Sequence, residues 1–246
     1  GWYTLSLHDA LPILSDRGDA NGGRDLAQFI HWCRTRGALT IADSHTLTGN
    51  PHRLIAEGKP VAEYRLLEPL LPELDVFFTS SDEAKLIQNT IGKPRDWVEF
   101  DERENNTHFL EFLIERFWRD KGRTRLLGVT VSNGAYEIHR GPDGQTAGPV
   151  KVISRFLSGE VIDLVGAGDS FRAGLITYLA SNLDAFRAGS FDFTQAVQAG
   201  NLFASLFIKA PLDDRYANIK TYGKMLRVLQ TDKGFDSFEA LCKALD

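Results

Sequence analysis

The sequence predicts a three-layer α/β fold, with a mainly parallel sheet between two layers of helices. Segments whose apolar residues recur at helical spacing alternate with short apolar runs, as in α/β domains. The first unit of this kind is a helix predicted over 24–36, a glycine stop at Gly37 and a buried strand over 38–42 that ends at Asp43. A later apolar run meets a glycine-rich turn at 166–168, where another helix starts. Such sheets bind ligands at the carboxyl ends of their strands, so polar residues at those ends are candidate site residues.

The composition is typical of a globular protein that binds small molecules. With 246 residues, 43% of them hydrophobic and 25% charged, the chain can bury one large core or two small ones. Its net charge of −5, without a cluster of Lys and Arg, argues against a nucleic-acid partner or an anionic membrane surface. No apolar run reaches membrane-spanning length. Cys33 and Cys242 lie too far apart in the sequence to indicate a disulfide framework or a zinc site, and we expect a cytoplasmic protein.

Residues 1–13 do not have the pattern of a domain start. The decapeptide at 4–13 can be back-translated into a common short-read sequencing adapter, which predicts a non-native leader in front of a partial domain over 14–246. The alternative is a genuine opening strand that ends at Pro12, in which only Leu5 and Leu7 show the alternation of a strand.

The middle of the chain continues the alternation of helix and strand. An amphipathic segment over 63–71 is followed by a strand over 74–79, a polar helix start at 80–86 and a loop or short turn of helix over 92–106. The helix predicted over 107–120 carries an aromatic stripe, and at this spacing the stripe indicates core packing, not a cofactor site.

Strands precede the glycine-rich turn and helices follow it. The predicted strands lie at 125–131, 136–139 and 150–153. After the helix that starts at Asp169, the predicted helices lie at 194–209, 215–229 and 235–245. The last two are closing helices and imply no separate domain.

The glycine-rich turn is the most informative stretch of the sequence. Gly166 and Gly168 let the backbone bend so that successive N–H groups point outwards at the positive end of the helix dipole, which favours an anion such as a phosphoryl group. Asp169 places a carboxylate at the same helix start. A base beside an anion-binding turn is typical of group transfer, in which the carboxylate takes a proton from an attacking hydroxyl.

Other interpretations of the turn fit less well. A Rossmann fingerprint needs a third glycine where the chain has Phe171, and the P-loop sequence G-x-x-x-x-G-K-[ST] is absent. An esterase of the GDS type needs a histidine after Ser170, whereas the last histidine of the chain is His139. A helix cap and tight turn without chemistry is the remaining alternative.

The turn also carries a resemblance to a known family. Residues 163–171 (DLVGAGDSF) resemble the C-terminal signature of the ribokinase-like, or PfkB, family of sugar and nucleoside kinases. The resemblance covers about 24–229 and implies a ribokinase-like α/β/α fold, in which the strands before the turn form an antiparallel edge. The resemblance makes Asp169 the catalytic base. The anion hole that it implies consists of Gly166, Ala167 and Gly168.

The resemblance further implies metal sites. In cation-activated members of the family, the residues that match Asp163 and Val165 hold a monovalent cation such as K⁺. The family's N-x-x-E element matches 80–83, with Ser80 in place of the asparagine and Glu83 retained. Glu83 is therefore the candidate for orienting the water shell of Mg²⁺. The alternative is that Glu83 only complements the positive end of the helix that follows.

Several positions are implied to contact the nucleotide. Asp43 ends a strand whose side chains lie near the phosphates in the family. Thr130, Ser132 and Gly134 match its T-L-G-x-x-G loop, with a serine for the first glycine and one residue fewer. Asn201 lies in the helix that matches the lining of the adenine pocket. A hydrogen bond inside the core is an equal alternative for this polar residue in an apolar helix.

The implied reaction is transfer of the γ-phosphoryl group of ATP to a hydroxyl of a sugar or nucleoside, with Mg²⁺ as the charge bridge. A homodimer is the assembly that the resemblance allows. The family's opening segment, which holds the lid and most sugar contacts, has no counterpart here, so the resemblance implies a truncated copy that binds nucleotide weakly or is inactive. Robust sugar phosphorylation by this chain would refute that expectation. The alternative is a non-catalytic regulator that binds a nucleotide or sugar on the same fold.

Overall fold

The computed structural model describes residues 21–44, 48–94, 97 and 101–246, and the predicted leader at 1–13 lies outside them. The chain divides into two compact units. The first, here called the sheet unit, comprises the described residues up to Val131 together with Tyr136–Val150. The second, the helical unit, comprises Ser132–Ala135 and Lys151–Asp246.

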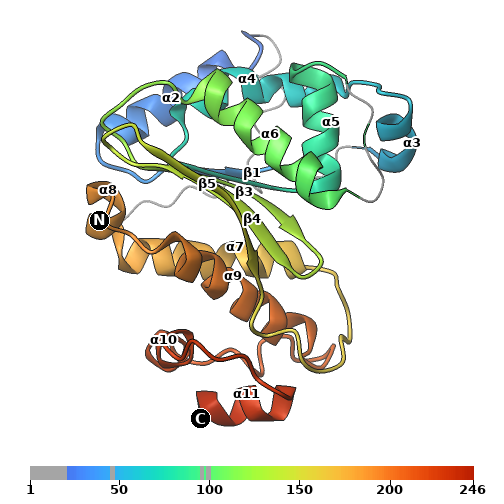
Figure 1. Cartoon of the computed structure of the whole chain (residues 1–246), viewed down its shortest axis with the longest axis vertical. Helices are drawn as coiled ribbons and strands as arrows, with labels where there is room; N and C mark the ends of the chain where they lie inside the picture. Colours follow the sequence, from blue (N-terminus) through green and yellow to red (C-terminus); the bar gives the residue numbers. More distant parts are fainter. Residues whose placement is uncertain (1–20, 45–47, 95–96, 98–100) are drawn as a thin grey trace. The chain divides into compact units, whose positions relative to one another are not determined.

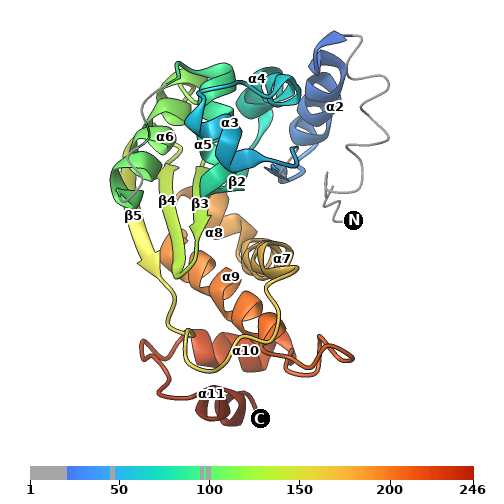
Figure 2. The ribbon, with the colours of Figure 1, turned by 90° about the vertical axis from the view of Figure 1, so that its right-hand side faces the viewer.

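The strands form one sheet in the order β1-β2-β3-β4-β5 (Figures 1 and 2). Their bounds are Ile41–Asp43, Val76–Ser80, Arg125–Val131, Gly134–Arg140 and Thr146–Ile153. β1 and β3 both pair with β2 in parallel, in a register that places Asp43 opposite Phe78 and Ser80 opposite Thr130. The short turn between β3 and β4 makes that pair antiparallel. The predicted parallel strands and antiparallel edge are thereby confirmed.

Helices cover the sheet within the sheet unit. Their bounds are Arg24–Thr35 (α2), Pro51–Ala56 (α3), Leu67–Leu70 (α4), Ser81–Ile91 (α5) and Glu102–Phe117 (α6). The 3₁₀ turns η2 (Ala62–Leu66) and η3 (Leu71–Glu73) flank α4. α5 and α6 lie side by side over one face of the sheet, and both contact β3 (Figure 1).

Two predictions about these helices were wrong. α6 begins at Glu102, before the predicted start at 107, because the side chain of Asp101 caps it by accepting the Glu104 N–H at 2.9 Å. In α2, the spacing of the apolar residues predicts one helical face made of Leu26, Phe29, Ile30 and Cys33. Phe29 is 44% exposed, however, and it stacks on Trp32 with the ring centroids 6.1 Å apart. The buried face of α2 is centred instead on Leu26, Ala27 and Ile30.

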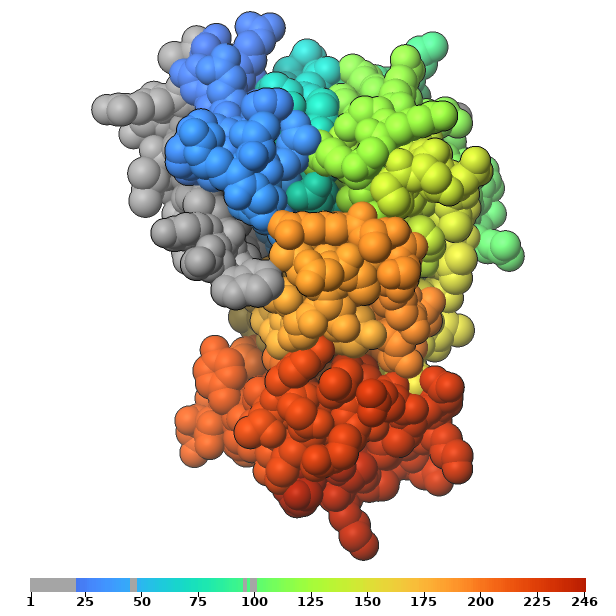
Figure 3. Space-filling view, turned by 90° about the vertical axis from the view of Figure 1, so that its left-hand side faces the viewer, coloured from blue at the N-terminus to red at the C-terminus, as the bar shows by residue number. Residues whose placement is uncertain are grey.

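The helical unit contains α7 (Ala167–Ser181), α8 (Leu183–Ala188), α9 (Phe193–Ile208), α10 (Tyr222–Leu229) and α11 (Phe238–Leu245). α7 packs along α9, and α10 packs against α11. In Figure 3 the red surface of the last two helices adjoins the orange surface of the preceding ones. The helix predicted from 215 begins only at Tyr222, because residues 211–219 form successive turns. No helix in the described ranges is long and apolar enough to span a bilayer.

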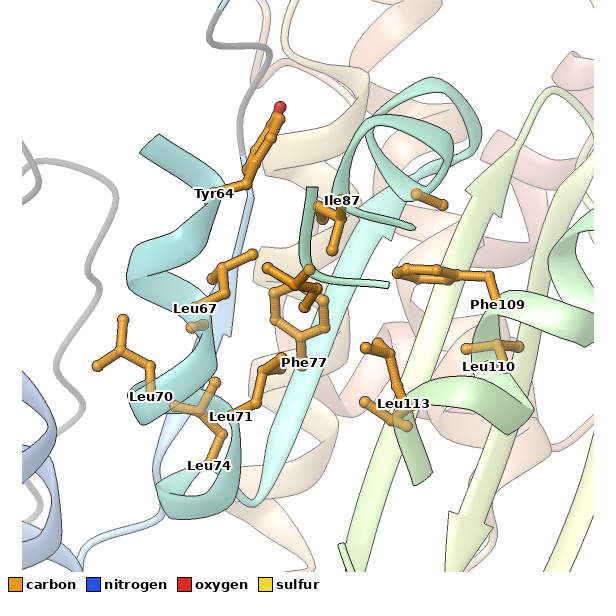
Figure 4. Close-up of a cluster of buried hydrophobic side chains, with 14 of the residues drawn as sticks. Tyr64, Leu67, Leu70, Leu71, Leu74, Phe77, Ile87, Phe109, Leu110 and Leu113 are labelled. Atoms are coloured by element: carbon orange, nitrogen blue, oxygen red, sulfur yellow. The ribbon is translucent and has the colours of Figure 1, made fainter. Parts of the chain in front are cut away.

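Each unit has its own hydrophobic core. In the sheet unit, apolar side chains from α4, β2, α5 and α6 converge around Phe77 (Figure 4). Phe109 of the predicted aromatic stripe is fully buried there, which confirms its role in packing. Trp118, just after α6, is also buried, and its Nε1 donates to the Leu71 carbonyl at 2.7 Å. In the helical unit, Phe156 packs with apolar residues of α9, α10 and α11.

The contact between α7 and α9 leaves no room for a side chain at Gly174. A Cβ there would collide with the Ala199 carbonyl and lie 2.9 Å from the Cβ of Phe203. We expect Gly174→Ala to lower the free energy of unfolding by about 1–3 kcal/mol, because two packed helices must separate to admit the methyl group. Denaturant unfolding measures this change.

Gly223→Ala in α10 is the matched control for Gly174→Ala. No atom lies within 4 Å of the Cβ that this change adds. Since alanine has the higher helix propensity, the control should be as stable as the wild type or up to about 1 kcal/mol more stable. Equal stabilities of the two variants would contradict the close packing of α7 on α9.

Candidate functional site

Gly166 caps α7 in a conformation that suits only glycine. Its φ is 85°, and its carbonyl accepts the Ser170 N–H at 2.9 Å, so the helix starts directly at Ala167. A Cβ on Gly166 would lie 2.8 Å from the ring of Phe207. The backbone conformation and this close approach together explain the glycine.

The N–H groups at this helix start are only partly engaged. The Ala167 N–H donates to the Leu164 carbonyl at 3.1 Å. Within the described part of the chain, the N–H groups of Gly166 and Gly168 donate to no main-chain carbonyl. Asp169, in the first turn of α7, is exposed. An exposed acidic residue and two available N–H groups therefore share the positive end of the helix dipole.

Arg172 adds a positive charge to this helix start. A Cβ on Gly168 would meet its guanidinium, so the Arg172 side chain lies directly beside the turn. We did not predict this residue from the sequence. The signal was present, because Arg172 lies three positions after Asp169 and such residues are neighbours on a helix.

Residues 161–165 lead into the turn as an exposed apolar loop. Leu164 and Val165 are 67% and 76% exposed. The loop is anchored at the end of α9, where the N–H groups of Ile162 and Asp163 share the Ile208 carbonyl at 2.9 and 3.2 Å. Main-chain hydrogen bonds to a helix end therefore position the turn.

The two residues expected to hold a monovalent cation face Arg215. The Nη2 of Arg215 donates to the Val165 carbonyl at 2.9 Å and to the Asp163 carbonyl at 3.3 Å, and it lies 3.5 Å from Oδ2 of Asp163. The other carboxylate oxygen of Asp163 accepts the Val165 N–H at 3.0 Å. The structure thus brings Asp163 and Val165 together, around an arginine that we did not predict.

Asn201 makes a hydrogen bond inside the helical unit. It is buried in α9, and its Nδ2 donates to Oε1 of Gln198 at 3.3 Å. Gln198 in turn donates to the Ile153 carbonyl at 2.7 Å and accepts the Arg155 N–H at 3.3 Å. The core hydrogen bond that was the alternative to an adenine contact is therefore present, and the adenine contact stays a prediction.

The turn between β3 and β4 carries two more predicted nucleotide contacts. Ser132 is exposed, whereas Gly134 is buried against the Val152 carbonyl. Between them, the Asn133 carbonyl accepts the Ser154 N–H at 2.9 Å. An exposed serine hydroxyl beside a fixed turn can meet a ligand, and its role with the phosphates stays a prediction.

The carboxyl ends of β1, β2 and β3 carry polar residues at one edge of the sheet. Asp43 ends β1, and Ser80 ends β2 opposite Thr130 of β3. Thr79 links these ends, since its hydroxyl lies 2.5 Å from the Ser44 hydroxyl and its carbonyl accepts the Thr130 hydroxyl at 3.2 Å. The structure therefore brings Asp43 and Thr130 to the same edge, as expected for parallel strands.

Glu83 takes part in the cap of α5. Its Oε2 accepts the Ser80 N–H at 2.8 Å and the Thr79 hydroxyl at 3.4 Å, while the Ser80 hydroxyl accepts the Glu83 N–H at 3.4 Å. This capping box matches the alternative in which Glu83 serves the helix start. Among the residues that the structure describes, no three His, Cys, Asp or Glu side chains group into a metal site. The magnesium role of Glu83 stays a prediction.

Lys209, at the end of α9, is a buried cation. Its Nζ donates to the carbonyls of Phe156 and Ser158 at 2.8 and 2.6 Å and to the Ser205 hydroxyl at 2.9 Å. Burial lowers the pKa of Lys209 to about 8, and a smaller charge interaction with Cys242 acts in the opposite direction. The lysine is therefore mainly charged at neutral pH.

The lowered pKa of Lys209 makes stability depend on pH. Its ordinary value is 10.5, so between pH 8 and 10.5 the unfolded chain retains a proton that the folded protein has lost. Hence the contribution of Lys209 to the free energy of unfolding rises with pH across this window. We expect Lys209→Met to remove this rise and, at neutral pH, to cost about 1–3 kcal/mol because three acceptors lose their donor.

Denaturant unfolding at neutral pH and across this window measures both effects of Lys209→Met. The control is Lys243→Met, which removes an exposed lysine from α11. A stability profile of Lys209→Met that runs parallel to the wild-type profile would contradict the assignment.

Comparisons with known proteins agree on one fold. Residues 140–215 match the model of the pfkB family carbohydrate kinase. No curated protein sequence matches the chain.

Among solved structures, a putative ribokinase from Agrobacterium tumefaciens matches with a TM-score of 0.52 and 17% identity, over 84% of this chain and 52% of its own. A fructokinase from Vibrio cholerae O395, solved with fructose, ADP and a calcium ion, matches with a TM-score of 0.50 and 19% identity, over 81% of this chain and 53% of its own. An adenosine kinase from Trypanosoma brucei brucei matches with a TM-score of 0.50 and 20% identity, over 76% of this chain and 48% of its own. These proteins share the fold of the chain, which spans about half of their length.

Proposed function

Residues 140–215 match the model of the pfkB family carbohydrate kinase, and from this premise we propose that the protein transfers the γ-phosphoryl group of ATP to a hydroxyl of a sugar or nucleoside. The observation that carries the proposal is the start of α7. There the exposed Asp169 and the available N–H groups of Gly166 and Gly168 lie within one helical turn. A base and a phosphoryl site must be this close to act on the same reacting atoms.

Asp169 is the proposed general base. Its carboxylate takes the proton of the acceptor hydroxyl as that oxygen bonds to the γ-phosphorus, and the bond from phosphorus to the bridging oxygen breaks to release ADP. The N–H groups of Gly166 and Gly168 donate to the non-bridging oxygens, and the Arg172 guanidinium beside them adds positive charge. The proton then passes from Asp169 to solvent, to which this residue is exposed.

The other predicted contacts are assigned to the nucleotide and its metal ion. Asp43 and Thr130 share the sheet edge and are assigned to the nucleotide. When bound, Mg²⁺ would neutralise charge on the phosphates. Glu83 would orient its water shell. The residues assigned to the phosphates and the adenine are Ser132, Gly134 and Asn201.

A non-catalytic regulator that binds a nucleotide or sugar is the second candidate. Two observations favour it, because the Ala167 N–H is engaged by the Leu164 carbonyl and Asn201 is engaged by Gln198. Ala167 can join the anion hole only if its N–H leaves that carbonyl. Turnover separates the two candidates, since a regulator binds ATP without forming ADP.

The experiment is incubation of the protein with ATP, Mg²⁺ and a panel of sugars and nucleosides, with ADP and phosphorylated product quantified together. A kinase forms the two in equal amounts. Binding of ATP without either product would support the regulator. We further propose that 14–246 form a partial kinase domain, that the protein is a homodimer and that it is located in the cytoplasm.

A further inference from the structure

An arginine lies at the position where a monovalent cation was expected. The Nη2 of Arg215 lies 2.9 Å from the Val165 carbonyl oxygen, 3.3 Å from that of Asp163 and 3.5 Å from an Asp163 carboxylate oxygen. Two carbonyls and a carboxylate converging on one point are oxygen donors of the kind that hard metal cations prefer. Because the guanidinium nitrogen is already there, these residues do not fit a second cation, which it would repel at this range.

Further contacts fix the guanidinium in place. Its central carbon lies 4.5 Å from the centroid of the Phe207 ring, and the Arg215 side chain is only 15% exposed. Phe207 is also the residue that a side chain on Gly166 would strike. Arg215 therefore contacts both the loop before the turn and the aromatic ring that packs on the turn.

A second side-chain cation in the helical unit also contacts main-chain carbonyls. Lys209 places its ammonium on the carbonyls of Phe156 and Ser158, upstream of the turn. Side-chain cations thus hold the segment before α7 at two places through its main-chain oxygens. An arginine stays protonated in proteins and, being part of the chain, does not have to be bound from solution.

We infer that Arg215 is a resident cation that replaces the monovalent metal ion, so that the segment leading into α7 is held in place without K⁺. The inference rests on the proposed function, because the turn that Arg215 supports is the proposed phosphoryl site. Arg215 is a positioning residue, which acts by holding Asp163 and Val165.

Thermal unfolding of the wild-type protein tests this inference without any variant. We expect the same Tm in KCl, NaCl and N-methylglucamine chloride at equal ionic strength, because general screening is then equal and no site is open to K⁺. A rise in Tm specific to K⁺ would overturn the inference. Binding of Tl⁺, a K⁺ mimic detected by thallium NMR, at this site in the wild type would overturn it as well.

Arg215→Ala removes the guanidinium and leaves the three oxygens. We expect this variant to be less stable than the wild type in N-methylglucamine chloride. In KCl it should regain roughly 2–4 °C of Tm, because K⁺ can then bind the freed oxygens.

Arg155→Ala is the matched control, since Arg155 in the same unit donates to the carbonyls of Leu229 and Thr231. This control should lose stability without a specific response to K⁺. Equal K⁺ responses of the two variants would contradict the inference. Should Arg215→Ala not fold in any of the salts, the wild-type experiment decides alone.

Failure of this inference and failure of the proposed function give different results. The Tm measurements require no turnover, so they test Arg215 even if the protein transfers no phosphoryl group. If it does transfer one, we expect the same rate in KCl and N-methylglucamine chloride. A rate that depends on K⁺ would overturn the role of Arg215 and leave the kinase proposal intact.

Discussion

Asp169→Asn is expected to lower the rate of ATP-dependent phosphoryl transfer by about 10²–10⁴-fold, the usual contribution of a general base. Asparagine cannot take the proton of the acceptor hydroxyl, whereas the N–H groups of Gly166 and Gly168 are unchanged. Affinity for ATP should stay the same or rise slightly, because a negative charge beside the triphosphate is removed. Single-turnover kinetics and equilibrium binding of ATP measure the two quantities separately.

The matched control for this change is Asp184→Asn. Asp184 is an exposed acid in the first turn of α8, so the substitution makes the same chemical change at another helix start. We expect it to alter neither rate nor affinity. The assignment of Asp169 as base fails if its asparagine variant keeps the wild-type rate, or if ATP affinity falls as far as the rate.

Gly166→Ala is expected to weaken ATP binding about tenfold or more and to lower the free energy of unfolding by about 1–3 kcal/mol. The loss of affinity follows because a shifted helix start no longer aims its N–H groups at one phosphoryl group. The loss of stability has two causes, a φ of 85° that alanine rarely adopts and a Cβ that would lie 2.8 Å from the Phe207 ring. ATP titration and denaturant unfolding of the variant measure the two effects.

Gly122→Ala separates backbone strain from the effect on the site. Gly122 has a φ of 88°, and no atom lies within 4 Å of an added Cβ. This control should lose stability through strain alone and bind ATP as the wild type does. If Gly166→Ala also binds ATP normally, its turn does not hold the phosphates.

Long apolar elements could be predicted from the sequence with accurate bounds. β3 has the predicted bounds, and α9 runs from Phe193 to Ile208 where 194–209 was predicted. Both are dominated by apolar residues, whose spacing and length distinguish strand from helix. The helices α3 and α8 were missed because each has only 6 residues, too few to show a helical period.

The candidate site could be predicted where it depends on the local backbone. The start of α7 follows from the spacing of Gly166 and Gly168, which fixes where the chain can turn. The hydrogen bond from Asn201 to Gln198 could also have been predicted, since residues three apart on a helix are neighbours. Arg215 could not be predicted, because its main partners are carbonyl groups that any residue would present at those positions.

The central claim is that one helix start joins a proton acceptor to a phosphoryl-binding turn. Phosphorus NMR of the wild type and Asp169→Asn, each with ATP, Mg²⁺ and the panel of sugars and nucleosides, tests it most directly. We predict that the wild type forms ADP and a phosphomonoester in equal amounts and that the variant forms neither in the same time. ATP bound by the wild type without any phosphomonoester, or equal yields from the two proteins, would contradict it.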